Sequence, residues 1–268
     1  MMRPAMAAQM LADIAKNQAL ALPTMRAIEQ RRHRTRTARQ QGAEYARATY
    51  GYLRRDLSPH HPLTGTLLEV GPGTDLGVCA LFAGDGMDEA VAIDIVPWQQ
   101  PDPQIYRDLG VEDVLERVRY MAPVTIDDTP FEDASFDVVI SYSCFEHFLK
   151  PSAAVREIAR LLKPGGITGH VIDMRNHRNF AEPLDHLRYP EWLWRLMVSR
   201  RPFATNRWRL YNYIEAFDQV GLRVVEARVT EKAEVSEHVR QQLQPEWRCR
   251  DRTDLEPVVA WIAARKDT

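Results

Sequence analysis

The chain has 268 residues, of which 45% are apolar and 27% are charged, and its formal net charge is −2. These values are typical of one large or two small globular domains, and the near-neutral charge gives no support for nucleic acid as a partner. No stretch approaches the roughly 18 apolar residues of a membrane span, and no signal peptide is visible, so we expect no membrane association.

The cysteines argue against a stapled or metal-bound fold. Cys79, Cys144 and Cys249 lie far apart and show neither a CxxC pair nor a Cys/His spacing. Such a pattern disfavours both a disulfide framework and a zinc site. We therefore expect a reducing, cytoplasmic location and no bound metal.

The first 62 residues predict a helical extension. Apolar side chains recur at helical spacing from Met10 to Leu20, and Pro23 interrupts them. Residues 31–41 are polar and rich in arginine, which favours a solvated helix or a tether over a site for an anionic substrate or a partner. Residues 43–57 predict a further helix, which Pro59 and Pro62 end.

From residue 65 onward, short apolar runs alternate with helical patterns. Strands are predicted over 66–70, 90–95, 136–141 and 167–174. Helices are predicted over 76–82 and 153–162, the second stopped by "KPGG" at 163–166, and 111–118 reads as a helix or a turn. This order predicts a parallel sheet covered by helices on both faces.

Residues 175–209 interrupt the alternation with an irregular segment rich in histidine, tryptophan and arginine. Within it, "PEWLWRLM" places apolar side chains at helical spacing, which indicates core packing. Beyond it we expect a helix over 211–220, a strand over 222–229, a charged helix over 231–243 and a last strand over 257–263.

The first strand ends in "LLEVGPGTDLG", residues 67–77, which points to a ligand site. Closely spaced glycines allow a sharp turn and close approach of a ligand, and the following helix aims its free N–H groups at the same spot. Glu69 at the strand end disfavours a phosphate there and suits a cationic group. Asp94 ends the next strand 21 residues after Gly73, the spacing of an acidic residue that binds ribose hydroxyls. The pair indicates a nucleoside with a positively charged tail.

With these motifs the sequence resembles the class I S-adenosylmethionine-dependent methyltransferases, of the type 11 kind. "LLEVGPGTDLG" and "VAIDI" are similar to the first two family motifs, and residues 125–166 are similar to the stretch that carries the third and fourth. The resemblance implies a Rossmann-like, mostly parallel seven-stranded sheet flanked by helices. It also implies a methyltransferase domain over 63–268, with a helical cap after the fourth strand at about 175–209.

Carried over residue by residue, the resemblance implies a set of cofactor contacts. Glu69, Gly71 and Gly73 would shape the methionine pocket, and Asp94 would bind the ribose diol. Ile126 and Asp127 would flank the adenine, and Ser141 would lie beside the cofactor. Two positions depart from the family pattern: Asp75 stands where many relatives have a third glycine, and Thr125 stands where many have an aspartate that reaches the adenine.

Two histidines are candidates for the catalytic base. His147 follows the "FDVVIS" strand, where it either removes a proton or caps the following helix. His186, in "LDHLRYP", is the alternative base in the expected cap, where such insertions often cover the substrate in this family. An imidazole suits proton abstraction from a hydroxyl because its ordinary pKa is about 6.5.

The expected function is methyl transfer from S-adenosyl-L-methionine to a hydroxyl of a small molecule or a sugar. Residues 185–222 are similar to bacterial methyltransferases associated with surface-glycan or secondary-metabolite pathways. RNA or protein methylation and a non-catalytic, methyltransferase-like scaffold remain as alternatives, and Glu69 disfavours a nicotinamide-dependent oxidoreductase. A homodimer is a further expectation, because residues 1–40 resemble an arm that packs on a partner.

Overall fold

The computed structural model describes residues 4–97, 102–201 and 203–268. The strands are β1 (Gly65–Val70), β2 (Met87–Ile93), β3 (Val118–Met121), β4 (Phe136–Tyr142), β5 (Leu162–Asp173), β6 (Leu222–Lys232) and β7 (Pro257–Lys266). The helices are α1 (Pro4–Ala19), α2 (Pro23–Gln40), α3 (Ala43–Leu57), α4 (Gly77–Gly84), α5 (Pro103–Leu109), α6 (Pro151–Leu161), α7 (Glu191–Val198), α8 (Leu210–Gln219), α9 (Glu237–Gln241), α10 (Pro245–Arg248) and α11 (Arg252–Leu255). Three 3₁₀ turns join them: η1 (Glu112–Arg117), η2 (Phe145–His147) and η3 (Asp185–Arg188).

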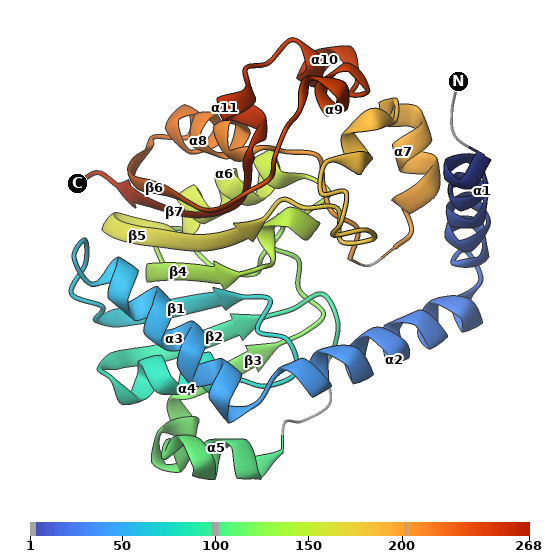
Figure 1. Cartoon of the computed structure of the whole chain (residues 1–268). Coiled ribbons are helices and arrows are strands. Elements are labelled where there is room, and N and C mark those ends of the chain that lie inside the picture. The colour runs from blue at the N-terminus through green and yellow to red at the C-terminus, as the bar shows by residue number, and fades with distance from the viewer. Residues whose placement is uncertain (1–3, 98–101, 202) are drawn as a thin grey trace.

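The seven strands form one sheet in the order β3-β2-β1-β4-β5-β7-β6 (Figure 1). All neighbours pair in parallel except β7, which runs antiparallel to both β5 and β6. The predicted Rossmann-like, mostly parallel seven-stranded sheet is therefore confirmed.

Strand β3 was not predicted. Because it adds one strand to the count, the predicted position of the cap has to be corrected. Its four residues are only partly buried at the sheet edge, so they lack the continuous apolar run that marks the central strands. The irregular segment that begins after Asp173 consequently follows the fifth strand and not the fourth. The "KPGG" stretch is also not a loop, because β5 begins at Leu162 directly after α6.

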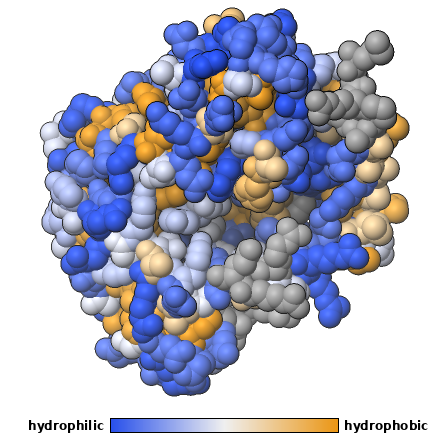
Figure 2. Space-filling view, viewed as in Figure 1, coloured by the Kyte–Doolittle hydropathy of each residue, from blue (hydrophilic) through white to orange (hydrophobic). Residues whose placement is uncertain are grey.

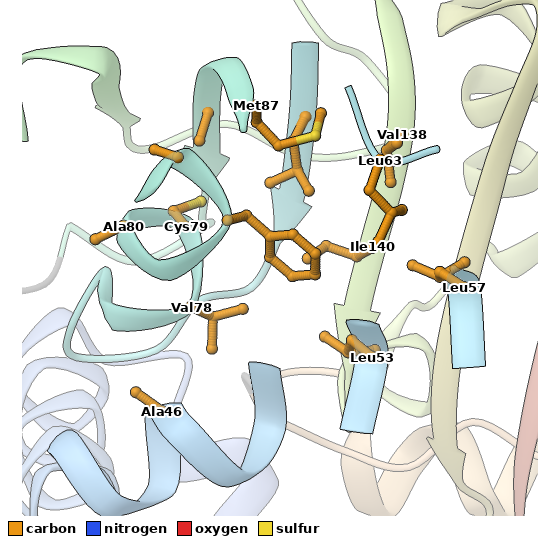
Figure 3. Packing of buried hydrophobic residues seen from close by; sticks show 14 of the residues in the cluster. Ala46, Leu53, Leu57, Leu63, Val78, Cys79, Ala80, Met87, Val138 and Ile140 are labelled. Carbon is orange, nitrogen blue, oxygen red and sulfur yellow. The ribbon is translucent and has the colours of Figure 1, made fainter. Parts of the chain in front are cut away.

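Side chains alternate between two cores, one on each face of the sheet. Leu67 of β1 belongs to the core covered by α3, α4 and α5, whereas Leu68 belongs to the core covered by α6 and α8. Figure 3 shows the first core, where side chains from α3 and α4 point toward those of β4. The labelled residues that show this are Ala46, Leu53, Val78, Val138 and Ile140.

The N-terminal helices pack against the rest of the molecule at two places, the core of the sheet and the cap. Helix α3 contributes the fully buried Leu53 and Leu57 to the core of the sheet. Helix α1 lies beside α7 of the cap. Helix α2 runs from α1 to α3 along one side of the molecule (Figure 1). Asn17 of α1 donates to the Leu196 carbonyl at 2.9 Å and accepts from the Arg200 N–H at 2.9 Å. The expected arm thus packs on this chain's own cap.

The cap and the C-terminal region agree in part with the sequence patterns. The predicted helix in "PEWLWRLM" is α7, which buries Trp194, Met197 and Val198 but leaves Trp192 exposed. The charged helix expected over 231–243 shrinks to α9, because β6 continues to Lys232. Among the described residues, none of the helices has both the length and the apolar character needed to cross a bilayer.

Candidate functional site

A cavity of about 720 Å³ opens where the parallel strands β1, β2 and β4 end. Its floor is formed by the turn after β1, by Asp94 after β2 and by the loop after β4. Its other walls come from distant parts of the sequence, namely α2, α3, residues 199–201 and Phe203. Ligands of open α/β sheets bind at this carboxyl edge, where the strand order reverses. Here the reversal lies between β1 and β4.

The turn after β1 is shaped by two glycines with positive φ, Gly71 at +74° and Gly73 at +81°. A side chain at Gly71 would collide with the Cys144 sulfur, and one at Gly73 would collide with the Gln41 amide. The Gln41 Oε1 accepts from the Thr74 N–H at 2.6 Å and from the Thr74 hydroxyl at 2.7 Å. Gln41, the residue after α2, therefore fixes the glycine turn, a role that the sequence did not reveal.

The residue that departs from the family glycine pattern, Asp75, anchors the start of α4. Its Oδ1 accepts from the Gly77 N–H at 2.9 Å, while its Oδ2 is buried without a hydrogen-bond partner. A side chain at Gly77 would press on Ala46 of α3 at 2.7 Å. Gly77 therefore permits the close helix packing, and Asp75 adds a second carboxylate to the cavity wall.

Glu69 lies at the end of β1, is 5% exposed and lines the cavity. Burial raises its pKa to about 7, nearby Asp75 and Asp94 add to the rise, and hydrogen bonds from Cys79 oppose it. Its Oε2 is buried without a hydrogen-bond partner. A buried, unsatisfied carboxylate oxygen at a cavity wall is costly unless a ligand supplies a donor or a positive charge.

Asp94, Ile126 and Asp127 all line the same cavity. The Asp94 Oδ1 accepts from the Val96 N–H at 2.9 Å, which fixes the carboxylate just beyond β2. Ile126 is buried, and Asp127 lies 3.7 Å from the Lys150 ammonium. Thr125 lines the cavity as well.

Ser141 and His186 do not reach the cavity. The Ser141 hydroxyl is fully buried and lies 2.8 Å from the His170 Nδ1, because its side chain points to the opposite side of β4 from Tyr142. His186 is fully buried against Trp194 and lines neither described cavity. We therefore withdraw Ser141 as a cofactor contact and His186 as a base.

His147, by contrast, lies on the wall shared by the main cavity and a second cavity of about 540 Å³. Its ring is 5.0 Å from the His177 ring, and its Nδ1 is buried without a hydrogen-bond partner. Burial lowers its pKa to about 3, and His177 contributes to the decrease. The imidazole is thus neutral at physiological pH.

A parallel sheet with a glycine turn, a buried acidic strand end and a second acidic residue after the next strand defines a nucleoside-binding α/β protein. Residues 68–168 match the family described as "Methyltransferase domain". This match runs from β1 into β5 and supports a class I S-adenosylmethionine-dependent methyltransferase.

Solved structures share the fold at low sequence identity. A "putative sarcosine dimethylglycine methyltransferase" from Galdieria sulphuraria is 17% identical with a TM-score of 0.55, over 82% of this chain and 86% of that one. The [4+2]-cyclase SpnF is 20% identical with a TM-score of 0.51, over 81% and 80%. Geranyl diphosphate C-methyltransferase from Streptomyces coelicolor A3(2) is 15% identical with a TM-score of 0.50, over 82% and 75%. These proteins have different activities, so the likeness defines the fold and not the acceptor.

The cavity fits the cofactor of the family, S-adenosylmethionine. That molecule carries positive charge on its ammonium and sulfonium groups, and the unsatisfied oxygens of Glu69 and Asp75 face the space where such charge is needed. The glycine turn and the Asp94 carboxylate, which the Val96 N–H holds in place, line the same cavity.

Because the pKa of Glu69 is raised, we expect cofactor affinity to increase with pH. In the free protein its pKa of about 7 leaves the carboxyl largely protonated at pH 6, whereas a cationic ligand favours the ionised form. Binding should therefore be about tenfold weaker at pH 6 than at pH 8, with release of a proton on binding. By the same linkage, the free protein should lose stability as the pH rises from 4.5, the ordinary pKa, to about 7.

Calorimetric titration in buffers of different ionisation enthalpy measures both the affinity and the released proton. Glu69→Gln serves as the matched variant, because it has the same shape and cannot titrate; its affinity should be low at both pH values. Equal affinity at pH 6 and pH 8 in the unchanged protein would count against this role of Glu69.

Proposed function

We propose that the protein transfers a methyl group from S-adenosylmethionine to a hydroxyl of a small molecule or a sugar. The observation that carries this proposal is that Glu69, Asp94 and His147 all line one cavity. Its volume lies within the usual range of small-molecule sites. Helix α2, residues 199–201 and Phe203 line it as well.

In this proposal the residues of the chain bind, align and exclude water. Glu69 holds the positive end of the cofactor, Asp94 holds the ribose, and Ile126 with Asp127 flanks the adenine. The cofactor supplies the electrophilic methyl group when bound. Enclosure by α2 and the cap keeps the acceptor oriented and dry, which is the main contribution that a protein makes to a displacement of this kind.

His147 marks the acceptor end of the cavity. It is neutral and has an unsatisfied Nδ1, and the second cavity lies directly behind it. Because its buried neighbours Glu146 and His177 are unsatisfied as well, we propose that the three act together on the acceptor hydroxyl.

Arginines near the same end bear on the kind of acceptor. Arg26 and Arg200 line the cavity from α2 and from the end of the cap helix. Their charge supports an acceptor with an acidic group, since a guanidinium pairs well with carboxylate or phosphate. This assigns to the N-terminal helices a part in substrate recognition.

The proposal is tested by finding where the methyl group goes. Extract from the source cells is incubated with the protein and S-adenosylmethionine labelled in the methyl group, then separated into small molecules, RNA and protein. Label should enter the small-molecule pool and should be lost with Asp94→Ala. Label in RNA or protein would favour the alternative acceptors, and no transfer at all, with intact cofactor binding, would favour a scaffold or another reaction.

Self-association is a further proposal. Leu11 of α1, Leu22 just before α2 and Ile28 of α2 are exposed, and Figure 2 shows apolar side chains along the edge of the molecule formed by α1. Such side chains support a contact with a second copy. Sedimentation that finds only a monomer at high protein concentration would end this proposal.

A further inference from the structure

The described residues bring together Glu146, His147 and His177, whose ligand atoms all lie within 4.8 Å of one another. The first two belong to η2 after β4, and the third belongs to the loop after β5. Sequence spacing does not reveal this cluster, because 30 positions separate His177 from His147. Parallel pairing of β4 with β5 places the two loops side by side at the carboxyl edge of the sheet.

The buried carboxylate of Glu146 indicates that a ligand binds at this cluster. Glu146 is 0% exposed, and neither of its carboxylate oxygens has a hydrogen-bond partner of normal geometry. Burial raises its pKa well above the ordinary value, an effect that the backbone N–H groups of Glu146 and Asp173 only partly oppose. His147 and His177 each have an unsatisfied buried ring nitrogen as well. Three unsatisfied groups of this kind in one place are costly without a shared partner.

We propose that Glu146, His147 and His177 bind a divalent transition-metal ion of the zinc type. Two imidazoles and one carboxylate are the ligand set of catalytic zinc sites, which keep further coordination positions open. In a tetrahedral zinc site, ligand atoms lie about 3.3 Å apart, so the side chains need to close by up to about 1.5 Å. Mg²⁺ and Ca²⁺ prefer oxygen ligands and are not expected here.

Groups around the cluster restrain its side chains. The Asp173 Oδ2 lies 3.4 Å from the His177 Nε2, and Arg175 pairs with that same carboxylate at 2.7 Å. Asp173 thus lies on the side of the free Nε2 and restrains the His177 ring. The Asn206 N–H donates to the Glu146 carbonyl at 2.6 Å, which fixes the turn.

The position of the cluster connects it with the proposed function. His147 lies on the wall between the two cavities, and His177 lines the second one. An acceptor hydroxyl bound at the open position would lose its proton to water more readily, because a bound metal ion lowers the pKa of an oxygen ligand. This role rests on the proposed function, whereas metal binding itself does not.

The experiment is a calorimetric titration of the untagged, chelator-treated full chain with Zn²⁺. Cys249→Ser is used as the background, because that thiol is free and exposed and would bind zinc on its own. One ion per chain should bind, Mg²⁺ should not, and Glu146→Gln or His177→Gln should each weaken Zn²⁺ binding at least tenfold. His238→Gln, which removes an exposed imidazole elsewhere, should leave the affinity unchanged.

Thermal unfolding provides a readout in which all three proposed ligands stay unchanged. Zn²⁺ should raise the melting temperature of the Cys249→Ser protein, because a ligand that binds the folded state stabilises it. No binding by this protein, or full binding by both Glu146→Gln and His177→Gln, would overturn the proposal. Titration of the same sample with S-adenosylmethionine tests the metal site and the proposed methyl transfer separately. Cofactor binding without zinc binding would exclude only the metal site. Zinc binding without cofactor binding would exclude the proposed methyl transfer.

Discussion

Replacement of His147 by alanine should lower the rate of methyl transfer by about 10²- to 10⁴-fold, the usual loss when a group that assists proton removal is deleted. The affinity for S-adenosylmethionine should stay within about twofold. In the proposed function His147 acts on the acceptor, whereas Glu69 and Asp94 hold the cofactor. A large loss of turnover with unchanged cofactor affinity follows from this division of roles.

The measurement is single-turnover transfer of labelled methyl groups, with cofactor affinity taken from calorimetry. His238→Ala is the control, because it deletes an exposed imidazole far along the sequence. Rates that are equal in His147→Ala and in the unchanged protein would remove His147 from the mechanism, whether as a base or as a metal ligand.

Replacement of Asp94 by alanine should weaken S-adenosylmethionine binding by about 10- to 100-fold. Hydrogen bonds to a charged group are worth roughly 1.5–3 kcal/mol each, and one carboxylate can accept from both ribose hydroxyls. The Val96 N–H holds the Asp94 side chain in place, so the carboxylate needs little reordering to bind. The fold should tolerate the change, because Asp94 follows the last residue of β2.

Asp88→Ala is the matched control for this prediction. Asp88 lies near the start of the same strand, is exposed and is remote from the cavity lining. Calorimetric titration should give a normal affinity for this variant. If Asp94→Ala bound as tightly as Asp88→Ala, the ribose would not be held by Asp94.

Most of the fold was predictable because its strands and helices each produce a recognisable local pattern of apolar residues. Buried parallel strands such as β1 and β4 are continuous apolar runs, and helices such as α6 show apolar spacing on one side. Strand β3 escaped because an edge strand of four partly buried residues carries no such run. The extent of α9 was overestimated because charged residues suit an edge strand as well as a helix.

The site was predictable only where a short motif encodes it. Four residues lie within a few positions of the ends of β1 and β2, namely Glu69, Gly71, Gly73 and Asp94. Their places in the structure therefore follow directly from the predicted strands and from the turn after β1. Ser141 was misplaced because one residue along a strand changes the face that a side chain occupies. That single position separates it from the cavity-lining Tyr142.

The remaining walls depend on tertiary contacts that sequence spacing does not report. Gln41 reaches the glycine turn across 33 positions of sequence, and His177 meets His147 through strand pairing. His186 looked like a cap residue that faces substrate, yet it packs under Trp194. Burial of polar side chains such as Glu146 breaks the usual rule for charged residues, so composition could not indicate it.

The most direct test of the central claim is a crystal structure of the protein with S-adenosylhomocysteine. The claim is that the cavity at the ends of β1, β2 and β4 binds the cofactor and the acceptor together. The ribose should contact Asp94, the amino group should lie at Glu69, and the sulfur should face the end of the cavity marked by His147. Nucleoside density elsewhere, or a sulfur that faces away from His147, would contradict the account.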